Sequence, residues 1–188
     1  MAIRDCLALS FALDFGLKDG NPDNSPTRIG ELRSKAKPYN SPPTKETYQA
    51  ADELAQKCLN FLEEIICYSG ASAVVAVPPR PNKPFDLPSY LAQRIATHWR
   101  RENSCDHIKT IRPRPEMKNV DISQKLKNLE NTIEIDPNAF KNKIILLVDD
   151  LYQSGVTMNY TAMKLLEAGA QKVFGLACEK TCTNDDNV

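Results

Sequence analysis

KIILLVDDLYQSGVTMNYTAMKLLEAG, residues 143–169, is the most informative segment of the chain. It begins with Ile144–Val148, an unbroken run of apolar, mostly branched residues that is typical of a buried strand. Asp149 and Asp150 follow the run, and a polar turn over residues 152–157 comes next. From about Thr157 the apolar residues recur at helical spacing until a glycine ends the pattern. The segment therefore predicts a strand, a polar loop and a helix, which together form a βα unit.

The same segment has the residue types of a site for a phosphorylated sugar. Two carboxylates at the end of a strand can accept hydrogen bonds from sugar hydroxyls. The N–H groups of the turn and the positive end of the helix dipole can hold a phosphate. A Walker B strand of an ATPase has a similar apolar run, but the sequence contains no G-x-x-x-x-G-K-[ST] phosphate loop. It also lacks the G-x-G-x-x-G fingerprint of dinucleotide-binding proteins, which weakens that second alternative.

The rest of the chain alternates between strand and helix patterns. Alternating apolar residues over Cys6–Phe15 predict a half-buried strand, and helical spacing over Glu46–Tyr68 predicts a long helix. Thr44 is the expected N-cap of that helix, and because Thr47 replaces the usual Glu or Gln, no full capping box is expected. A short helix or helical turn is expected over residues 27–36, and helices are expected over 89–101 and 121–129. Residues 132–135 are expected as an extended segment or a turn, and strands near 73–77, 107–111, 144–148 and 172–178. This order predicts an α/β fold with a parallel sheet that helices cover on both faces.

The length of 188 residues suits a single main domain with an N-terminal addition. We expect three regions: a small N-terminal extension of strand and loop over residues 1–43, an α/β domain over residues 44–182, and a frayed polar tail over residues 183–188.

Composition excludes several classes of protein. Basic and acidic residues number 24 each, so the formal net charge is zero and gives no sign of a nucleic-acid or membrane surface. No apolar run of about 18 residues is present, and the first ten residues do not resemble a signal peptide, so a cytoplasmic location without membrane contact is expected. The six cysteines form no C-x-x-C pair and do not have the spacing of a structural zinc site. Cys58 and Cys67 are expected in the core as reduced thiols.

The run IILLVDDLYQSGVTM resembles the phosphoribosyl-pyrophosphate (PRPP) signature of type I phosphoribosyltransferases. In that signature an apolar strand and two acids precede a Thr-Thr/Ser-Gly-x-Thr turn; here Gln153 stands where the first threonine is usual. The wider chain resembles the ComF-type (competence protein F-like) branch of the family. This second resemblance covers most of the chain and is carried by Thr27–Tyr39 (TRIGELRSKAKPY), Ala73–Arg80, Phe85–Ala92 (FDLPSYLA) and Leu165–Val173.

The resemblance implies roles for particular residues. Asp149 and Asp150 would contact the ribose 2- and 3-hydroxyls, and Arg80 is the cation expected to act with them in catalysis. The 5-phosphate would be bound by N–H groups and hydroxyls of the turn, which comprises Gln153, Ser154, Gly155, Val156 and Thr157. The pyrophosphate loop would consist of Pro78, Pro79 and Arg80. Mg²⁺ would be held through PRPP oxygens and water, with no direct protein ligand.

A hood that closes over the site would come from the loop at residues 112–120, with Arg112, Arg114 and Lys118 as its cations. A solvated basic loop is the equally weighted alternative for that segment. No separate segment for recognising a nucleobase is visible. Tyr152 or Phe174 could stack on an acceptor base, and both are equally plausible as core residues.

The implied function is transfer of a phosphoribosyl group from PRPP to a nitrogen acceptor, with release of pyrophosphate. The alternative is a catalytically weak or inactive protein that senses PRPP or a nucleotide and assists DNA uptake, DNA processing or defence. In that case a DNA-processing or defence protein would be its partner. A homodimer is compatible with either function, and a scaffold that binds no ligand is the least supported hypothesis because the acid pair and the turn are intact.

Overall fold

The computed structural model describes residues 2–3, 7–38, 41–81, 83–113 and 122–181. Arg114 and Lys118 of the expected hood and the expected tail over residues 183–188 lie outside the described residues. Cys6 and Cys182 lie outside them as well.

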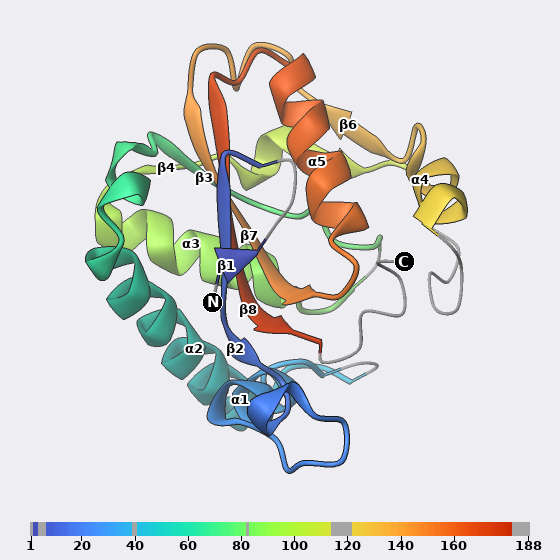
Figure 1. The fold of residues 1–188 in the computed structure, drawn as a ribbon. Helices are drawn as coiled ribbons and strands as arrows, with labels where there is room; N and C mark the ends of the chain where they lie inside the picture. Colours follow the sequence, from blue (N-terminus) through green and yellow to red (C-terminus); the bar gives the residue numbers. More distant parts are fainter. Residues whose placement is uncertain (1, 4–6, 39–40, 82, 114–121, 182–188) are drawn as a thin grey trace.

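A six-stranded sheet with the order β1-β2-β8-β7-β3-β4 forms the centre of the fold (Figure 1). The strands in this order are β1 (Ala2–Ile3), β2 (Leu9–Phe15), β8 (Lys172–Lys180), β7 (Ile144–Tyr152), β3 (Ala73–Ala76) and β4 (Glu102–Asn103). Only the short β1 is antiparallel to its neighbour among the described strands of this sheet, and the other pairings are parallel. The predicted α/β fold with a parallel sheet is therefore confirmed.

Helices cover both faces of the sheet, as the sequence predicts (Figure 1). One face carries α1 (Arg28–Lys35), α2 (Lys45–Glu64) and α3 (Leu87–Trp99), and the other carries α4 (Ile122–Leu129) and α5 (Val156–Glu167). Three short 3₁₀ turns complete the described elements: η1 (Lys18–Gly20), η2 (Ile66–Gly70) and η3 (Cys105–His107). None of the helices in the described part of the chain has the length and apolarity that crossing a bilayer requires.

The two covered faces explain why the central strands are apolar without interruption. In β7, Leu146 and Val148 belong to the apolar layer under α2 and α3, whereas Ile145 and Leu147 belong to the layer under α4 and α5. Successive side chains of a strand point to opposite faces, so a strand between two apolar layers needs an apolar residue at every position. Polar residues can enter β7 only where these layers end.

The prediction that residues 107–111 form a strand of the main parallel sheet is wrong. Its observed counterpart, β5 (Ile108–Thr110), lies outside the main sheet and pairs antiparallel with β6 (Ile133–Ile135) in a separate two-stranded sheet. The main sheet instead receives β4, only two exposed residues long, beside β3. So short a strand has no periodicity that sequence could show.

Several boundaries and local features also differ from the predictions. The helix predicted over Glu46–Tyr68 ends at Glu64, so Cys67 falls in η2 and is exposed, contrary to the expected core position. A capping box does form: the N–H of Thr47 donates to Oγ1 of Thr44 at 3.3 Å, and the N–H of Thr44 donates to Oγ1 of Thr47 at 3.1 Å. The short side chain of Thr47 thus accepts the hydrogen bond that the side chain of Glu or Gln accepts in the usual capping box.

The N-terminal segment is part of the sheet. The strand predicted over Cys6–Phe15 is observed as β2, which pairs parallel with β8 from Leu9 to Phe15. After η1 the chain forms α1, which packs against α2, β2 and β8. This arrangement brings the last residues of α1 to the carboxyl ends of β7 and β8, where ligands of parallel sheets bind.

Candidate functional site

Asp149 and Asp150 lie inside β7, which continues beyond the apolar run to Tyr152. Strand alternation directs their side chains to opposite faces of the sheet, with Asp150 on the side of α1. Asp150 is 5% exposed, whereas Asp149 is only half-buried. Oδ1 of Asp149 accepts a hydrogen bond from the N–H of Asp150 at 2.8 Å. The two neighbouring acids therefore have different surroundings.

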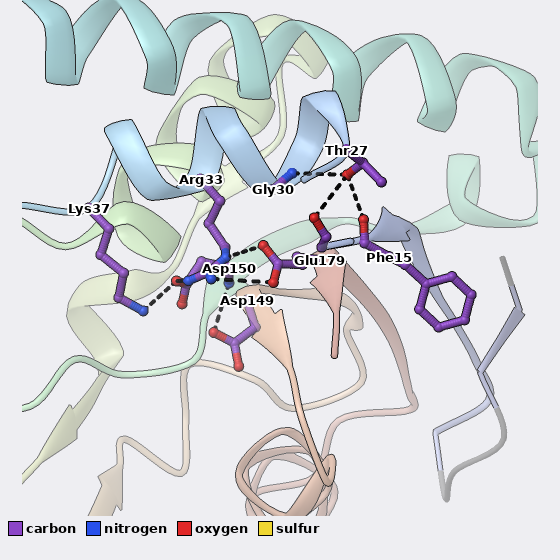
Figure 2. Close-up of polar contacts among 9 residues, drawn as sticks. Phe15, Thr27, Gly30, Arg33, Lys37, Asp149, Asp150 and Glu179 are labelled. Carbon is purple, nitrogen blue, oxygen red and sulfur yellow. Dashed lines mark hydrogen bonds and ion pairs between the residues drawn. The ribbon is translucent and has the colours of Figure 1, made fainter. Parts of the chain in front are cut away.

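Asp150 is the centre of a buried ionic network with the N-terminal segment (Figure 2). Nζ of Lys37, just beyond the end of α1, donates to Oδ2 of Asp150. Nη1 of Arg33 lies 3.6 Å from the same oxygen, and Nε of Arg33 donates to Oε2 of Glu179 on β8 at 2.5 Å. Two cations from α1 and its end thus neutralise two nearly buried acids from β7 and β8.

The pKa values of the acid pair are shifted in opposite directions. Burial raises the pKa of Asp149 well above its ordinary value, and the neighbouring charge of Asp150 raises it further. Burial acts in the same direction at Asp150, but Lys37 and then Arg33 outweigh it, so the pKa of Asp150 is lowered. The surroundings therefore favour the ionised form of Asp150 and the protonated form of Asp149.

The polar turn after β7 has the backbone geometry of a phosphate site. Gly155 is the N-cap of α5 and has a φ of 73°, a left-handed conformation that favours glycine. A Cβ at this position would lie 2.1 Å from the hydroxyl oxygen of Tyr152, so no other residue fits without displacing that ring. Within the described residues, no side chain caps the N-terminus of α5. The N–H groups of this turn and the helix dipole are arranged to receive an anion.

The loop between β3 and α3 forms the opposite side of the site. The N–H of Val77 donates to the carbonyl of Val148 at 2.9 Å, which continues the pairing of β3 and β7 up to the acid pair. Pro78 and Pro79 follow, and Arg80 is exposed. The loop ends where Oδ2 of Asp86 caps α3 by accepting the N–H of Ser89 at 3.0 Å. The predicted pyrophosphate loop therefore begins beside Asp149 and Asp150.

One cavity of about 250 Å³ brings the predicted groups together. The acid pair, the loop residues Pro78, Pro79 and Arg80, and the turn from Gln153 to Thr157 all line it. The cavity also contains Lys83, which the sequence offers as a further cation for the departing pyrophosphate, and two lysines that the sequence did not indicate, Lys37 and Lys125. Lys125 is 2% exposed and comes from α4, which follows the expected hood segment. Arg112, the hood cation that the structure describes, is exposed and does not line this cavity.

A sequence signal for Arg33 and Lys37 does exist. The two residues are four positions apart in the segment TRIGELRSKAKPY, a spacing that places two side chains on the same side of a helix, although α1 ends at Lys35. Their acidic partners lie more than a hundred positions later, and no local pattern indicates that pairing.

The two aromatic candidates for base stacking are largely buried. Tyr152 is 5% exposed and borders the cavity beside Gly155, whereas Phe174 packs its ring against Tyr68 in the core at 5.1 Å between centroids.

The fold is that of known phosphoribosyltransferases. No family model matches the chain, and no curated protein matches its sequence. An adenine phosphoribosyltransferase superposes with a TM-score of 0.52 at 12% identity, covering 82% of this chain and 98% of its own. The adenine phosphoribosyl transferase of Trypanosoma brucei, solved with AMP, pyrophosphate and ribose-5-phosphate, gives a TM-score of 0.51 at 11% identity, covering 94% and 88%.

The allosteric regulatory enzyme of purine biosynthesis gives a TM-score of 0.52 at 16% identity. It matches 77% of this chain, but this chain spans only about 30% of that enzyme's length. At these identities the similarity establishes the fold: an α/β phosphoribosyltransferase fold, with five parallel strands in its described sheet.

Proposed function

We propose that the protein binds PRPP with Mg²⁺ and transfers the phosphoribosyl group to a nitrogen acceptor, releasing pyrophosphate. The observation that carries this proposal is the single cavity where the acid pair, the Gly155 turn and the Pro78–Arg80 loop meet. The phosphoribosyltransferase fold supports it, because one protein of this fold was solved with AMP, pyrophosphate and ribose-5-phosphate.

Each part of the cavity has a role in this proposal. The turn from Gln153 to Thr157 and the N-terminus of α5 bind the 5-phosphate. Asp149 and Asp150 accept hydrogen bonds from the ribose hydroxyls. Arg80, on the loop that begins beside them, stabilises the charge of the departing pyrophosphate.

The reaction is a displacement at the anomeric carbon of ribose. The lone pair of the acceptor nitrogen forms the new bond to C1, while the C1–O bond breaks and its electron pair leaves with pyrophosphate. The acceptor then releases its surplus proton to solvent. The transition state resembles an oxocarbenium ion, so positioning of the sugar and stabilisation of the leaving charge are the main tasks of the protein.

The donor set of the cavity fits a Mg²⁺ ion that is held mainly by the substrate. No cluster of three or more His, Cys, Asp or Glu side chains occurs in the described residues, and Oδ2 of Asp150 already accepts from Lys37. Mg²⁺ keeps several waters and commonly binds through substrate phosphates and one or two carboxylates. When bound, the ion would neutralise the leaving pyrophosphate, and Asp149 and Asp150 would be the carboxylates near its water shell.

A titration with PRPP tests the proposal. The protein is mixed with PRPP, Mg²⁺ and a panel of nucleobases and amines, while binding is followed by calorimetry and pyrophosphate release by a coupled assay. We expect saturable binding, and release with at least one acceptor. Absence of binding, or equal binding by the Asp149→Asn/Asp150→Asn variant, would refute the site assignment.

A sensor of PRPP or a nucleotide is the second candidate function. One observation favours it. Oδ2 of Asp150 forms ion pairs with both Lys37 and Arg33, and these contacts restrict how far the carboxylate can move with the sugar during the reaction. PRPP binding without release on any acceptor would support this candidate. The ComF-type resemblance would then suggest a cytoplasmic partner in DNA processing or defence. Light scattering on the purified protein decides whether a homodimer forms.

A further inference from the structure

Lys37 reaches the cavity from the N-terminal segment, 113 positions before the acid it contacts. It lies just after Ala36, the C-cap of α1, and lines the cavity together with both acids. Its side chain is 22% exposed and lines the cavity, while Nζ donates to Oδ2 of Asp150 (Figure 2). A cation in this position can contact a ligand as well as the protein.

The segment that carries Lys37 is firmly attached to the sheet. Thr27 caps α1 by accepting the N–H of Gly30 at 3.1 Å, and its hydroxyl donates to the carbonyl of Phe15 at the end of β2 at 2.6 Å. Gly30 lies so close to β2 that a Cβ there would be 2.2 Å from the carbonyl oxygen of Gly16. The ion pair of Arg33 with Glu179 fixes the other end of α1 to β8. Lys37 is therefore held beside the cavity by contacts that do not involve a ligand.

Asp150 keeps a cationic partner if Lys37 moves. Nη1 of Arg33 is 3.6 Å from Oδ2 of Asp150, and the Arg33 side chain is largely buried. Arg33 has several N–H donors and can serve both Asp150 and Glu179. Lys37 can thus change partner without leaving a buried carboxylate unpaired, which would otherwise be costly.

The position of Lys37 indicates which ligand group it would meet. In the proposed complex the acid pair binds the ribose hydroxyls and the Gly155 turn binds the 5-phosphate. The carbon that bears the 2-hydroxyl is bonded to C1, whereas the 5-phosphate extends from the opposite end of the sugar. A cation paired with the acid that binds the 2-hydroxyl is therefore closer to the substituent on C1 than to the 5-phosphate.

We propose that Lys37 is a specificity-determining residue that passes from Asp150 to the diphosphate on C1 when the sugar binds. This inference rests on the proposed function and names the ligand class of the site: a ribose 5-phosphate with a diphosphate on C1, in preference to the sugar phosphate alone. Arg33 keeps Asp150 ionised and positioned in both states. Lys37 is consequently a second contact for the leaving group beside Arg80, and it comes from the segment at the other end of the chain.

The test compares two ligands, PRPP with Mg²⁺ and ribose 5-phosphate, which lacks the diphosphate. Their dissociation constants are measured by calorimetry for the native protein and for Lys37→Gln. We expect Lys37→Gln to weaken PRPP binding by about tenfold or more, because a hydrogen bond between charged groups is lost. Binding of ribose 5-phosphate should change by less than about twofold. Lys37→Arg, which keeps the charge, should restore most of the preference for PRPP.

Lys35→Gln is the matched control. Lys35 has the same charge two positions earlier, but its side chain is 54% exposed and faces Glu46 at 3.8 Å. Both ligands should bind this variant as they bind the native protein.

Three results would overturn the inference. An equal loss for both ligands in Lys37→Gln would mean that Lys37 acts only by holding Asp150. An unchanged affinity for PRPP would remove Lys37 from the site while leaving the proposed function intact. Failure of the native protein to bind PRPP would refute the proposed function and this inference together. If Lys37→Gln does not fold, Lys37→Met, which avoids a buried unpaired amide, is measured in its place and judged by the same criteria.

Discussion

Adjacent acids in a strand can have opposite effects on stability when alternation places them in different surroundings. Within the described residues, Asp149 forms no ion pair and is affected by Lys37 only through its charge, whereas Asp150 is paired with Lys37 and Arg33. Desolvation without a partner disfavours the ionised form, and a buried ion pair favours it. The acid pair therefore contains one residue that costs folding free energy at neutral pH and one that supplies it.

Asn substitutions should separate these two contributions. We expect Asp149→Asn to raise Tm by a few degrees at pH 7, since about 1 kcal/mol shifts Tm by about 2–4 °C at this chain length. Asp150→Asn should lower stability by about 2 kcal/mol or more, because it leaves Lys37 without its buried counter-charge. Thermal unfolding followed by circular dichroism measures both. A lower Tm for Asp149→Asn would contradict the conclusion that burial of Asp149 costs folding free energy.

The pH dependence of Tm provides a second measurement on the same variants. The native state holds the proton of Asp149 more tightly than the unfolded chain does, because the pKa of Asp149 is raised. Its contribution therefore declines as pH rises from the ordinary carboxyl range through the raised pKa, and Asp149→Asn should remove this decline. The pKa of Asp150 is lowered, so its contribution is present above the ordinary value and is lost as pH falls through the lowered one. Asp150→Asn should flatten the acidic side of the Tm profile.

Sequence predicted which residues line the cavity better than it predicted their interactions. The positions from Asp149 to Thr157 end a strand and open a helix, so local pattern alone brings them to one edge of the sheet. Pro78 to Arg80 follow another buried strand and reach the same edge. Lys37 was missed because its pairing with Asp150 depends on how α1 packs on β2 and β8, and that packing has no local signature.

At the scale of elements, the close contact between α1 and β2 determines where Lys37 lies. Gly30 on α1 leaves no room for a side chain against the backbone of Gly16. Which strands pair with one another was the feature of the elements that the sequence predicted least well. The segment near residue 108 has strand character, but its residues do not specify whether it joins β3 or pairs with β6.

Gly30→Ala should therefore move α1 away from β2. We expect a loss of about 1–3 kcal/mol in the free energy of unfolding from overpacking, together with weaker PRPP binding because Lys37 and Arg33 move with the helix. Urea unfolding and calorimetry measure the two effects. Gly70→Ala is the matched control, since the nearest atom to its new Cβ is Cδ1 of Ile144 at 3.9 Å, an ordinary contact. A stable Gly30→Ala variant with native affinity would show that the contact has no role in the site.

At the scale of the whole molecule, the two apolar layers on either side of the sheet form one cooperative unit with the site at its edge. Cys58 on α2 and Cys178 on β8 are both fully buried in the layer under α2 and α3, with 3.8 Å between their sulfur atoms. Cys67 in η2 is exposed. Cys105 lies between these extremes, and burial raises its pKa to about 11. The reactivity of these four cysteines therefore measures how accessible the surface, the intermediate layer and the core of the fold are to solvent.

Thiol labelling, read residue by residue with mass spectrometry, tests that cooperativity. Cys67 should react in the native protein at nearly the rate of an unfolded peptide. Cys58 and Cys178 should react at least about a thousandfold more slowly, since they become accessible only when the domain opens. Saturating PRPP and Mg²⁺ should slow Cys178 further and leave Cys67 unchanged, because a ligand that binds only the folded state reduces the open population. Rapid labelling of Cys178 with Cys58 still protected would instead show that the carboxyl end of β8 opens on its own, and the Arg33–Glu179 contact would then not anchor α1.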